Sequence, residues 1–450
     1  MTQRVTYPLL AHAGAQDIVA YRAGKPVTRA RFMGDARQLA ALLPPGQHLL
    51  NACSDRYHFA IGVAAALLSG KVCLLPPALT PEMLRRLRTF APDVYCLSDD
   101  ADLSNELPTL VFPAALEEWN CLDPVPRIDG AQQVAWIFTS GSTGAPQAHA
   151  KTWAGLVRAV RAGAVRLGLC DGRRHALVAT VPAQHMFGFE VSLLMAWQSG
   201  AAFDAARPFY PADVSAALAA LPEPRTLVTT PFHLRNWLDG ATHLPALENI
   251  VSATAPLSQP LALRAETLCG ARVFEIYGST ETGQVASRHP AHSAEWRLYD
   301  GLRLRVAAEH FWVSGGHIEC PVELQDVLEP VSAERFLLHG RSADLVNIAG
   351  KRSSLGYLNY QLTAIPGVLD GAYYMPAPVT VDGVTRLMAF VVAPGLTRAE
   401  LKAALLERVD PLFVPRPLFL VSALPRNENG KLTLVALQAL AASCREQAAR

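Results

Sequence analysis

Short apolar runs alternate with amphipathic stretches along most of the chain, and this alternation predicts the fold class. Four runs bounded by Gly, Pro, Ser or Thr have the composition of buried strands: residues 133–138, 175–180, 226–229 and 272–277. Helical periodicity occupies intervals between them: residues 153–167, 212–221 and 260–268. Strands that alternate with helices predict an α/β architecture with substantial parallel sheet. Ligands of such sheets usually bind at the carboxyl ends of the strands.

The last part of the chain has a different pattern. Residues 386–392 and 418–421 predict strands. Between them, Thr397-Arg-Ala-Glu400 forms a capping box that predicts a helix over residues 401–409, and three prolines follow that helix. This region is therefore expected to form a compact α+β unit.

Length, composition and charge agree with two domains of unequal size. The chain has 450 residues, of which 50% are apolar and 18% charged, so it can bury a sizeable core. We place a large N-terminal domain of several parallel-sheet layers at residues 1–341 and a small C-terminal domain at residues 342–450. The net charge of +1 does not indicate a basic surface that would bind nucleic acid or an anionic membrane.

Three features of the sequence favour a protein of the reducing cytoplasm. The longest apolar stretch, residues 60–68, is about half the ~20 residues that a membrane span needs, and it predicts a buried helix. The N-terminus lacks the continuous apolar region of a signal peptide. The eight cysteines are scattered and include no CxxC pair, so neither a disulfide framework nor a zinc site is expected.

The segment Thr139-Ser-Gly-Ser-Thr-Gly-Ala-Pro146 has the composition of a phosphate-binding loop. It follows a predicted strand and precedes a helix expected to begin near Thr152. Hydroxyls alternate with glycines, so backbone N–H and side-chain O–H groups can face one anion, and Gly141 and Gly144 allow close approach. The GxxxxGK[ST] pattern of the P-loop is absent. A phosphate cradle is favoured over the alternative, a flexible Ser/Gly linker.

Two further segments carry chemistry. In Tyr277-Gly-Ser-Thr-Glu281, at another strand end, the Tyr277 ring can stack on a base and Thr280 can bind a phosphate oxygen. Glu281 supplies the hard carboxylate that Mg²⁺ prefers. Leu424-Pro-Arg-Asn-Glu-Asn-Gly-Lys431 places Lys431 after a glycine turn, which suits an ammonium projected from a surface. Taken alone, each segment would be an ordinary turn.

In this order and spacing, the three segments resemble those of the adenylate-forming (ANL) superfamily of acyl-CoA synthetases, adenylation domains and luciferases. The resemblance covers nearly the whole chain. Other parts that are similar to superfamily segments are residues 51–55, 70–77, 182–188, 252–256, Asp326, 340–341 and 350–352.

The resemblance implies a two-step reaction with ATP and Mg²⁺. A carboxylate attacks the α-phosphate of ATP to give acyl-AMP and pyrophosphate, and a thiol then attacks the mixed anhydride. The first step depends on positioning and charge neutralisation. The small domain would rotate about a hinge after Arg341, withdrawing Lys431 and opening a path for the thiol.

The resemblance also implies roles for residues of this chain. The catalytic residues would be Lys431, Thr280, Glu281 and His185, with Glu281 holding Mg²⁺. The nucleotide would be bound by Thr139, Ser140, Gly141, Ser142, Thr143, Gly144, Ala255, Pro256, Tyr277, Gly278, Ser279, Thr280, Asp326, Arg341 and Lys431. The pocket for the acid would be lined by His185, Phe187, Phe189, Thr254, Gly278 and Gln284, with Phe232 nearby.

Two positions depart from the superfamily pattern. The phosphate loop usually continues Pro-Lys, but Gln147 stands here, which removes one positive charge. Lys151 and His149 are the candidates to replace it. The hinge position, usually Asp or Lys, is Ala343, and either Asp344 serves or the hinge is a small residue.

The candidate pocket favours an aromatic acid. Two or three aromatic residues with a few polar groups suit a planar, hydroxylated acid of the hydroxybenzoate or hydroxycinnamate type. Near residues 185–189 there is Glu190 but no aspartate to bind an amino group, which weakens an amino-acid substrate. The compact chain and the continuation Pro-Gln-Ala-His-Ala-Lys-Thr-Trp153 look like stand-alone ligases of aryl-polyene and xanthomonadin-type pigment clusters.

Those ligases load an aromatic acid onto acyl carrier protein, and coenzyme A is equally open as the acceptor. Two other classes stay open. One is an amino-acid or fatty-acid adenylating enzyme that acts in trans, and the other is a non-catalytic nucleotide-binding relative.

Overall fold

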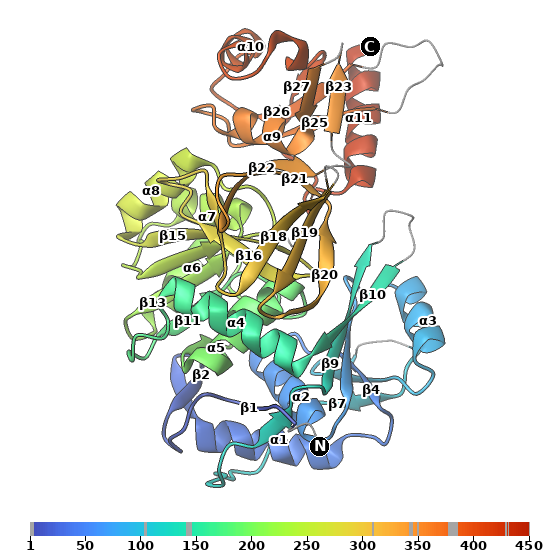
Figure 1. Cartoon of the computed structure of the whole chain (residues 1–450), viewed down its shortest axis with the longest axis vertical. Coiled ribbons are helices and arrows are strands. Elements are labelled where there is room, and N and C mark those ends of the chain that lie inside the picture. Colours follow the sequence, from blue (N-terminus) through green and yellow to red (C-terminus); the bar gives the residue numbers. More distant parts are fainter. Residues whose placement is uncertain are drawn as a thin grey trace.

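The computed structural model describes residues 4–102, 106–140, 146–307, 310–341, 345–348, 351–376, 386–427, 430 and 432–449. Figure 1 shows three tiers along the long axis of the molecule, with the N-terminal elements at one end and the C-terminal elements at the other. The architecture is α/β with parallel-sheet layers, as the alternation of strands and helices predicts.

The first tier is a six-stranded sheet with its helices. In sheet order its strands are β10 (Pro146–Thr152), β9 (Gln133–Ser140), β5 (Val72–Leu75), β4 (His48–Asn51), β6 (Tyr95–Ser98) and β7 (Thr109–Val111). The helices are α1 (Arg29–Leu42), α2 (Arg56–Leu68) and α3 (Pro81–Phe90). A short ribbon of β1 (Thr6–Pro8) and β8 (Arg127–Asp129) lies beside them.

The second tier is an eleven-stranded sheet. Its strands are, in order, β21 (Asp326–Pro330), β22 (Arg335–Arg341), β17 (Trp296–Leu298), β16 (Gly283–Arg288), β15 (Arg272–Ser279), β14 (Asn249–Ser252), β13 (Arg225–Thr229), β11 (Ala176–Ala179), β12 (Ala202–Asp204), β2 (Ile18–Arg22) and β3 (Lys25–Thr28). The run from β2 to β15 is parallel, and β15 pairs antiparallel with β16. The carboxyl ends of β11, β13, β14 and β15 therefore share one edge.

Helices cross between these parallel strands. They are α4 (Trp153–Leu167), α5 (Met195–Ser199), α6 (Pro211–Ala219), α7 (Pro231–Gly240), α8 (Gln259–Cys269) and a π-helix, η1 (Gly188–Leu194). The helix expected over residues 153–167 forms with those bounds. Thr152 caps it by accepting a hydrogen bond from the Gly155 backbone N–H, and Gly168 ends it in the left-handed conformation.

A separate three-stranded sheet of β18 (Leu302–Ala307), β19 (His310–Gly315) and β20 (Ile318–Leu324) adjoins the second tier. The hairpin of β23 (Leu345–Ile348) and β24 (Lys351–Ser354) leads to the third tier. That tier contains β25 (Asp370–Tyr374), β26 (Met388–Val392), β27 (Leu418–Leu420), α9 (Leu355–Thr363), α10 (Arg398–Leu406), α11 (Leu434–Ala449) and a 3₁₀ turn, Pro411–Phe413.

The third tier has a hydrophobic core of its own, built around residues such as Leu358, Tyr373, Val391 and Leu401. Its sheet does not join the other sheets among the described residues. The capping box forms at Thr397, and α10 begins directly after it, three residues earlier than expected. The domain boundary after Arg341 stays a prediction, and the hinge residues Ala343 and Asp344 lie outside the described residues.

One strand, β10, was not predicted from the sequence. It occupies residues 146–152, between the phosphate-loop segment and the helix expected near Thr152, and it pairs antiparallel with β9. The polar and small residues of this segment alternate, with Gln147, His149 and Lys151 separated by alanines. Alanine has little strand propensity, so pairing with β9 decides the conformation.

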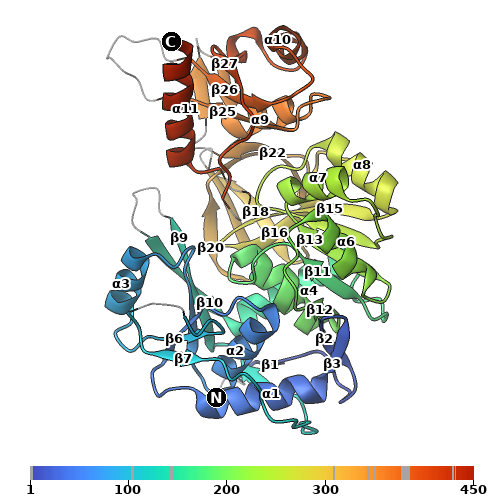
Figure 2. The same cartoon turned by 180° about the vertical axis from the view of Figure 1, so that it is seen from behind.

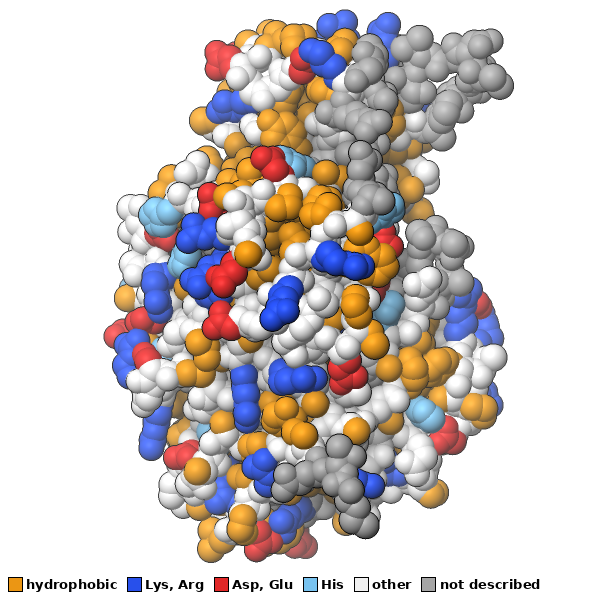
Figure 3. Space-filling model, viewed as in Figure 1, with side chains coloured by type: hydrophobic (Ala, Val, Ile, Leu, Met, Phe, Trp, Pro, Cys, Tyr) orange, Lys and Arg blue, Asp and Glu red, His pale blue; other side chains and the backbone are white. Residues whose placement is uncertain are grey.

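The apolar segment over residues 60–68 lies inside α2, whose residues are buried nearly all round, as expected for a core helix. Within the described part of the chain, no helix combines the length and apolarity needed to cross a membrane. Basic and acidic side chains are interspersed on the face that Figure 3 shows.

Candidate active site

The carboxyl edge of the parallel strands gathers most of the predicted site residues. The hydroxyls of Thr180 and Thr229, at the ends of β11 and β13, lie 2.9 Å apart. Thr254 follows the end of β14, and Tyr277 lies near the carboxyl end of β15, before the hairpin that joins β15 to β16. This is the edge at which an open parallel sheet binds its ligands.

Tyr277 and Asp326 lie together at this edge. The Tyr277 hydroxyl donates a hydrogen bond to Asp326 Oδ2 at 2.6 Å. The Tyr277 ring is only 9% exposed, and it packs against Trp296 and Phe336 with ring centroids 5.7 Å away in each case. Asp326 opens β21 opposite Arg341 of β22. The two residues expected to bind ribose are therefore cross-strand neighbours, although the Arg341 side chain lies outside the described atoms.

Glu281 stands on a closed turn between β15 and β16. The Ser279 backbone N–H donates to Thr282 Oγ1 at 3.0 Å, and the Thr282 N–H donates to Ser279 Oγ at 3.3 Å. The Glu281 side chain is 45% exposed. Burial raises its pKa, but hydrogen bonds from Ser279 and its own backbone, with the fields of His149 and Lys151, hold that pKa below the usual value.

This carboxylate fits a magnesium ion. Glu281 is an ionised, half-exposed oxygen ligand at the strand edge, and Mg²⁺ commonly binds one or two carboxylates together with waters and phosphate oxygens. When bound, the ion would neutralise charge on the phosphate oxygens.

The β9–β10 hairpin of the first tier meets this turn of the second tier. Thr139, near the end of β9, has its hydroxyl 3.2 Å from His149 Nε2 on β10. The same His149 nitrogen lies 3.5 Å from Glu281 Oε1, and Lys151 Nζ donates to the Glu281 carbonyl at 3.2 Å. The tertiary structure thus joins the first residue of the predicted phosphate loop to the predicted metal ligand. Gly141, Ser142, Thr143 and Gly144 lie outside the described residues, as does the Ser140 side chain.

The segment around His185 leads into the π-helix. Gly188 is required there, because a β-carbon would lie 1.9 Å from the Pro182 carbonyl oxygen. π-Helical turns occur frequently at functional sites. His185 and Phe187 are half-buried, whereas Phe189 is fully buried with its ring edge-to-face to Phe59 of α2. Phe189 therefore packs in the core in this structure, and its assignment to the acid site stays a prediction.

Glu190, on the π-helix, is a buried carboxylate that the sequence did not assign a role. It is 3% exposed, and burial raises its pKa to about 7 against the opposing effects of Lys151 and the Gln284 backbone. Gly283 makes room for it, since a β-carbon there would lie 2.7 Å from Glu190 Oε1. Its electrostatic interaction with Lys151 joins residues far apart in the sequence, and no local motif predicts it.

Gln284 and Thr254 differ in exposure. Gln284 is 2% exposed and packs against α4, where a β-carbon at Gly163 would lie 2.3 Å from its Oε1. Thr254 is exposed and has a φ of 77°, a left-handed conformation that is rare for a β-branched residue. Such strain is often stored at functional sites. Ala255 and Pro256 continue this loop along the strand edge.

The C-terminal turn approaches the same edge. A β-carbon at Gly430 would lie 3.3 Å from Thr230 Oγ1 and 3.4 Å from the Phe232 β-carbon. Gly430 thus packs at the carboxyl end of β13 and the start of α7. Figure 2 shows the β9–β10 hairpin extending toward the C-terminal tier as well. Lys431 lies outside the described residues.

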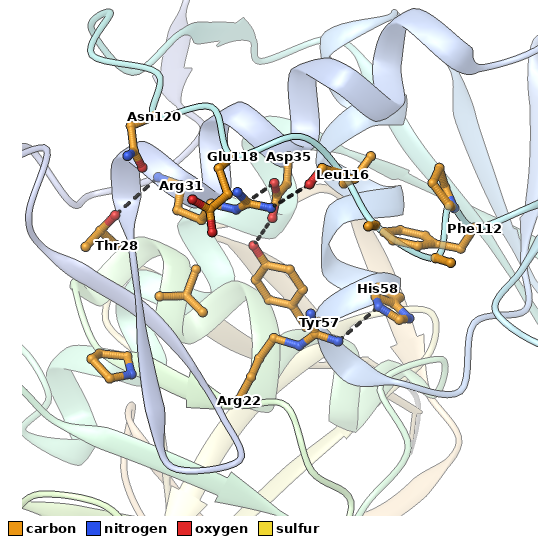
Figure 4. A pocket seen from close by; sticks show the side chains of 15 residues that line it. Arg22, Thr28, Arg31, Asp35, Tyr57, His58, Phe112, Leu116, Glu118 and Asn120 are labelled. Carbon is orange, nitrogen blue, oxygen red and sulfur yellow. Dashed lines mark hydrogen bonds and ion pairs between the residues drawn. The ribbon is translucent and has the colours of Figure 1, made fainter.

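A pocket of about 620 Å³ opens elsewhere, beside α1 and α2 (Figure 4). Its polar groups bond one another. Tyr57 donates to Asp35 at 2.7 Å, Arg31 lies 2.9 Å from Asp35, and the Arg22 guanidinium lies 3.0 Å from His58. It contains none of the predicted site residues.

Comparison with known proteins identifies the class. A family model described as "AMP-binding enzyme" matches residues 15–304, well over half of the chain. The chain therefore belongs to the AMP-binding enzyme family, in agreement with its resemblance to the adenylate-forming superfamily.

Among relatives, a 4-coumarate–CoA ligase of Rhodobacter capsulatus is 32% identical over 63% of this chain and 69% of its own length. A 3-hydroxybenzoate–CoA/4-hydroxybenzoate–CoA ligase of Thauera aromatica is 26% identical over 66% of this chain and 64% of its own. The fold is similar to o-succinylbenzoate CoA synthetase of Bacillus subtilis bound to its acyl-adenylate, with a TM-score of 0.79, 17% identity and coverage of 95% of this chain and 97% of that one.

Proposed function

We propose that this protein activates a hydroxybenzoate-type aromatic acid with MgATP and transfers the acyl group to the thiol of coenzyme A or an acyl carrier protein. The observation that carries the proposal is the meeting of the phosphate-loop hairpin with the Glu281 turn, at the strand edge that also holds Tyr277 and Asp326. Two relatives whose names specify coumarate or hydroxybenzoate support the aromatic acid.

In the first step, an oxygen of the acid's carboxylate attacks the α-phosphorus of ATP. The bond from that phosphorus to the bridging oxygen breaks, and pyrophosphate leaves. Thr139 and the rest of the 139–144 loop would hold the leaving pyrophosphate, and Thr280 would contact the α-phosphate. Asp326 and Arg341 would hold the ribose. Positioning of this kind lowers the barrier chiefly by aligning reactants and neutralising charge.

In the second step, the thiol sulfur attacks the acyl carbonyl carbon, the thioester forms, AMP leaves and the thiol proton passes to solvent. Lys431 would be withdrawn before this step. The acid-binding pocket would be lined by His185, Phe187, Thr254, Gly278 and Gln284. His185 would lie beside the reacting carboxylate. The half-buried Phe187 ring gives a planar acid an apolar surface on which to stack.

The test is a pyrophosphate-release screen over 3- and 4-hydroxybenzoate, 4-coumarate, octanoate and amino acids. We expect kcat/KM for a hydroxylated aromatic acid to exceed that for octanoate by at least about tenfold. A tenfold preference for octanoate or for an amino acid would contradict the aromatic assignment. Absence of pyrophosphate with every acid would favour a non-catalytic nucleotide-binding protein.

Glu281→Ala tests the site in the same assay. Loss of a metal or phosphate contact should reduce adenylate formation by about 10²-fold or more. Glu82→Ala is the matched control, because Glu82 is a 59% exposed glutamate of α3 that forms ion pairs with its helix neighbours Arg85 and Arg86. Wild-type turnover in Glu281→Ala would contradict the assignment of the turn.

The acceptor is tested separately with purified acyl-AMP. Coenzyme A and phosphopantetheinylated acyl carrier protein are compared by thioester formation. A clear preference, measured as kcat/KM, assigns the thiol.

A further inference from the structure

One face of β10 is directed toward the turn that carries Glu281, the proposed magnesium ligand. Side chains alternate along a strand, so Gln147, His149 and Lys151 share a face. His149 and Lys151 both contact Glu281. Ala148, on the opposite face, packs against the apolar core that includes Leu84 and Leu87 of α3. A charged side chain on this face of β10 therefore interacts electrostatically with the Glu281 turn.

Two acidic side chains lie near this turn, Glu281 on the turn itself and the almost fully buried Glu190 against Gly283. MgATP would bring further negative charge to the same place. Phosphate sites normally offset such charge with lysine, arginine or backbone N–H groups, and Gln147 at the start of β10 supplies no cation.

His149 is the other side chain of this face that contacts the turn. Its Nε2 lies 3.5 Å from Glu281 Oε1 and 3.2 Å from the Thr139 hydroxyl, so the imidazole is positioned to link the two by hydrogen bonds. Of the three side chains on this face, lysine is the one whose ordinary form at neutral pH is a cation.

Lys151 lies where it can provide the missing positive charge. Its Nζ donates to the Glu281 carbonyl at 3.2 Å, so the ammonium lies directly against the turn that carries the metal ligand. Glu190 and Glu281 are the carboxylates whose fields act on it. The lysine also spans the two tiers, since it belongs to the first sheet and bonds the second.

We propose that Lys151 is the positioning cation of the MgATP site, which holds the Glu281 turn against the phosphate-loop hairpin and supplies the positive charge that is missing at Gln147. This inference rests on the proposed function for its nucleotide but concerns a residue of this chain outside the family's loop pattern. Lys151 would act on MgATP through its field and through Glu281.

The direct readout is MgATP binding by isothermal titration calorimetry, without any acid present. Lys151→Met should weaken binding by about tenfold or more, since one charge-assisted contact in a partly buried site is worth about 1.5–3 kcal/mol. Lys151→Arg keeps the charge and should retain most of the affinity. Lys71→Met is the matched control, because Lys71 is another lysine whose Nζ bonds backbone carbonyls, at Pro44 and Gly46, away from the site.

Removing Lys151 alone leaves Glu190 buried without its cation, which can destabilise the fold. The double variant Lys151→Met/Glu190→Gln removes both charges and separates the two roles. If Lys151 serves MgATP, the double variant should fold with a thermal midpoint near wild type and still bind MgATP at least about tenfold more weakly. Wild-type affinity in the double variant would overturn the proposal, because Lys151 would then only balance Glu190.

Kinetics give a second readout. With saturating acid, Lys151→Met/Glu190→Gln should raise the KM for MgATP in pyrophosphate release and leave thioester formation from supplied acyl-AMP near the wild-type rate. Equal loss in both half-reactions would overturn the proposal. If wild-type protein releases no pyrophosphate with any acid, the proposed function fails, and the calorimetric comparison still decides the role of Lys151.

Discussion

The phenol of Tyr277 donates a 2.6 Å hydrogen bond to Asp326 Oδ2. It joins β15, a central strand of the large sheet, to β21 at the edge of that sheet. The two residues are 49 positions apart, and they belong to the surface at which we expect the adenosine of ATP to bind. The bond holds the carboxylate in one orientation before the nucleotide arrives.

Asp326→Ala should raise the KM for ATP by about 10- to 10²-fold, because hydrogen bonds to a charged acceptor contribute about 1.5–3 kcal/mol each. Tyr277→Phe should have a smaller effect, since it removes only the orienting donor. ATP titration of pyrophosphate release measures both. Asp300→Ala is the control, because the Asp300 side chain is 82% exposed. Equal KM values in Asp326→Ala and Asp300→Ala would count against the ribose assignment.

Lys431→Ala should slow acyl-AMP formation by about 10²- to 10³-fold with little change in the KM for ATP. An ammonium between the carboxylate and the α-phosphate offsets their repulsion mainly in the transition state. Supplied with acyl-AMP, the variant should still form thioester at a near-normal rate. Retention of both half-reactions would show that Lys431 is a solvated turn residue.

Arg426 should control the same half-reaction by holding the turn before Lys431. Its guanidinium donates two hydrogen bonds to Asp370, at 2.7 and 2.8 Å, and one to the Gly430 carbonyl at 2.9 Å. Arg426→Met should reduce pyrophosphate release by about 10- to 10²-fold, the size of effect expected from a misplaced reacting group. Thioester formation from acyl-AMP should change much less.

Arg445→Met is the control for Arg426→Met, because Arg445 lies on α11 of the same tier and contacts Met388 rather than the turn. A loss of similar size in both variants would indicate a general weakening of the C-terminal tier.

Thr254→Gly should not destabilise the protein, although an added glycine ordinarily costs about 0.5–1 kcal/mol. Thr254 has a φ of 77°, and relief of that strain offsets the entropic cost. Thr254→Ala keeps the unfavourable backbone conformation and serves as the comparison. Urea unfolding measures both, and a clear loss of stability in Thr254→Gly relative to Thr254→Ala would contradict the strain argument.

Glu190 should make stability fall as the pH rises. Its folded-state pKa is raised to about 7 by burial, above the usual glutamate value of about 4.3 in an unfolded chain. Between these values the folded protein holds a proton that the unfolded chain has released, so the free energy of unfolding decreases with pH across that window and is level above it.

Glu190→Gln should remove this contribution. Relative to wild type, the variant should gain stability at about pH 8 and differ little at about pH 4, as measured by urea unfolding at both values. A stability difference that is the same at both pH values would show that Glu190 does not titrate in this range.

Local patterns in the sequence were enough to predict the elements with strong periodicity and the order of the chemical segments. The helix over residues 153–167 has a hydroxyl cap and a glycine stop, and it forms with those bounds. The strands that carry Thr139 and Tyr277 near their carboxyl ends are apolar runs bounded by turn residues. These signals are local, and neighbours along the chain are enough to read them.

Which of these residues contact one another depends on the packing of the folded chain. β10 forms because β9 pairs with it, since its alanines carry little strand preference of their own. Phe189 lies in the core against Phe59, which no pattern around residue 189 distinguishes from a pocket wall. Lys151 reaches Glu281 across 130 residues of sequence. Contacts of this kind depend on how two sheets are packed, and the free energy that selects the packing is spread over the whole core rather than written in any one segment.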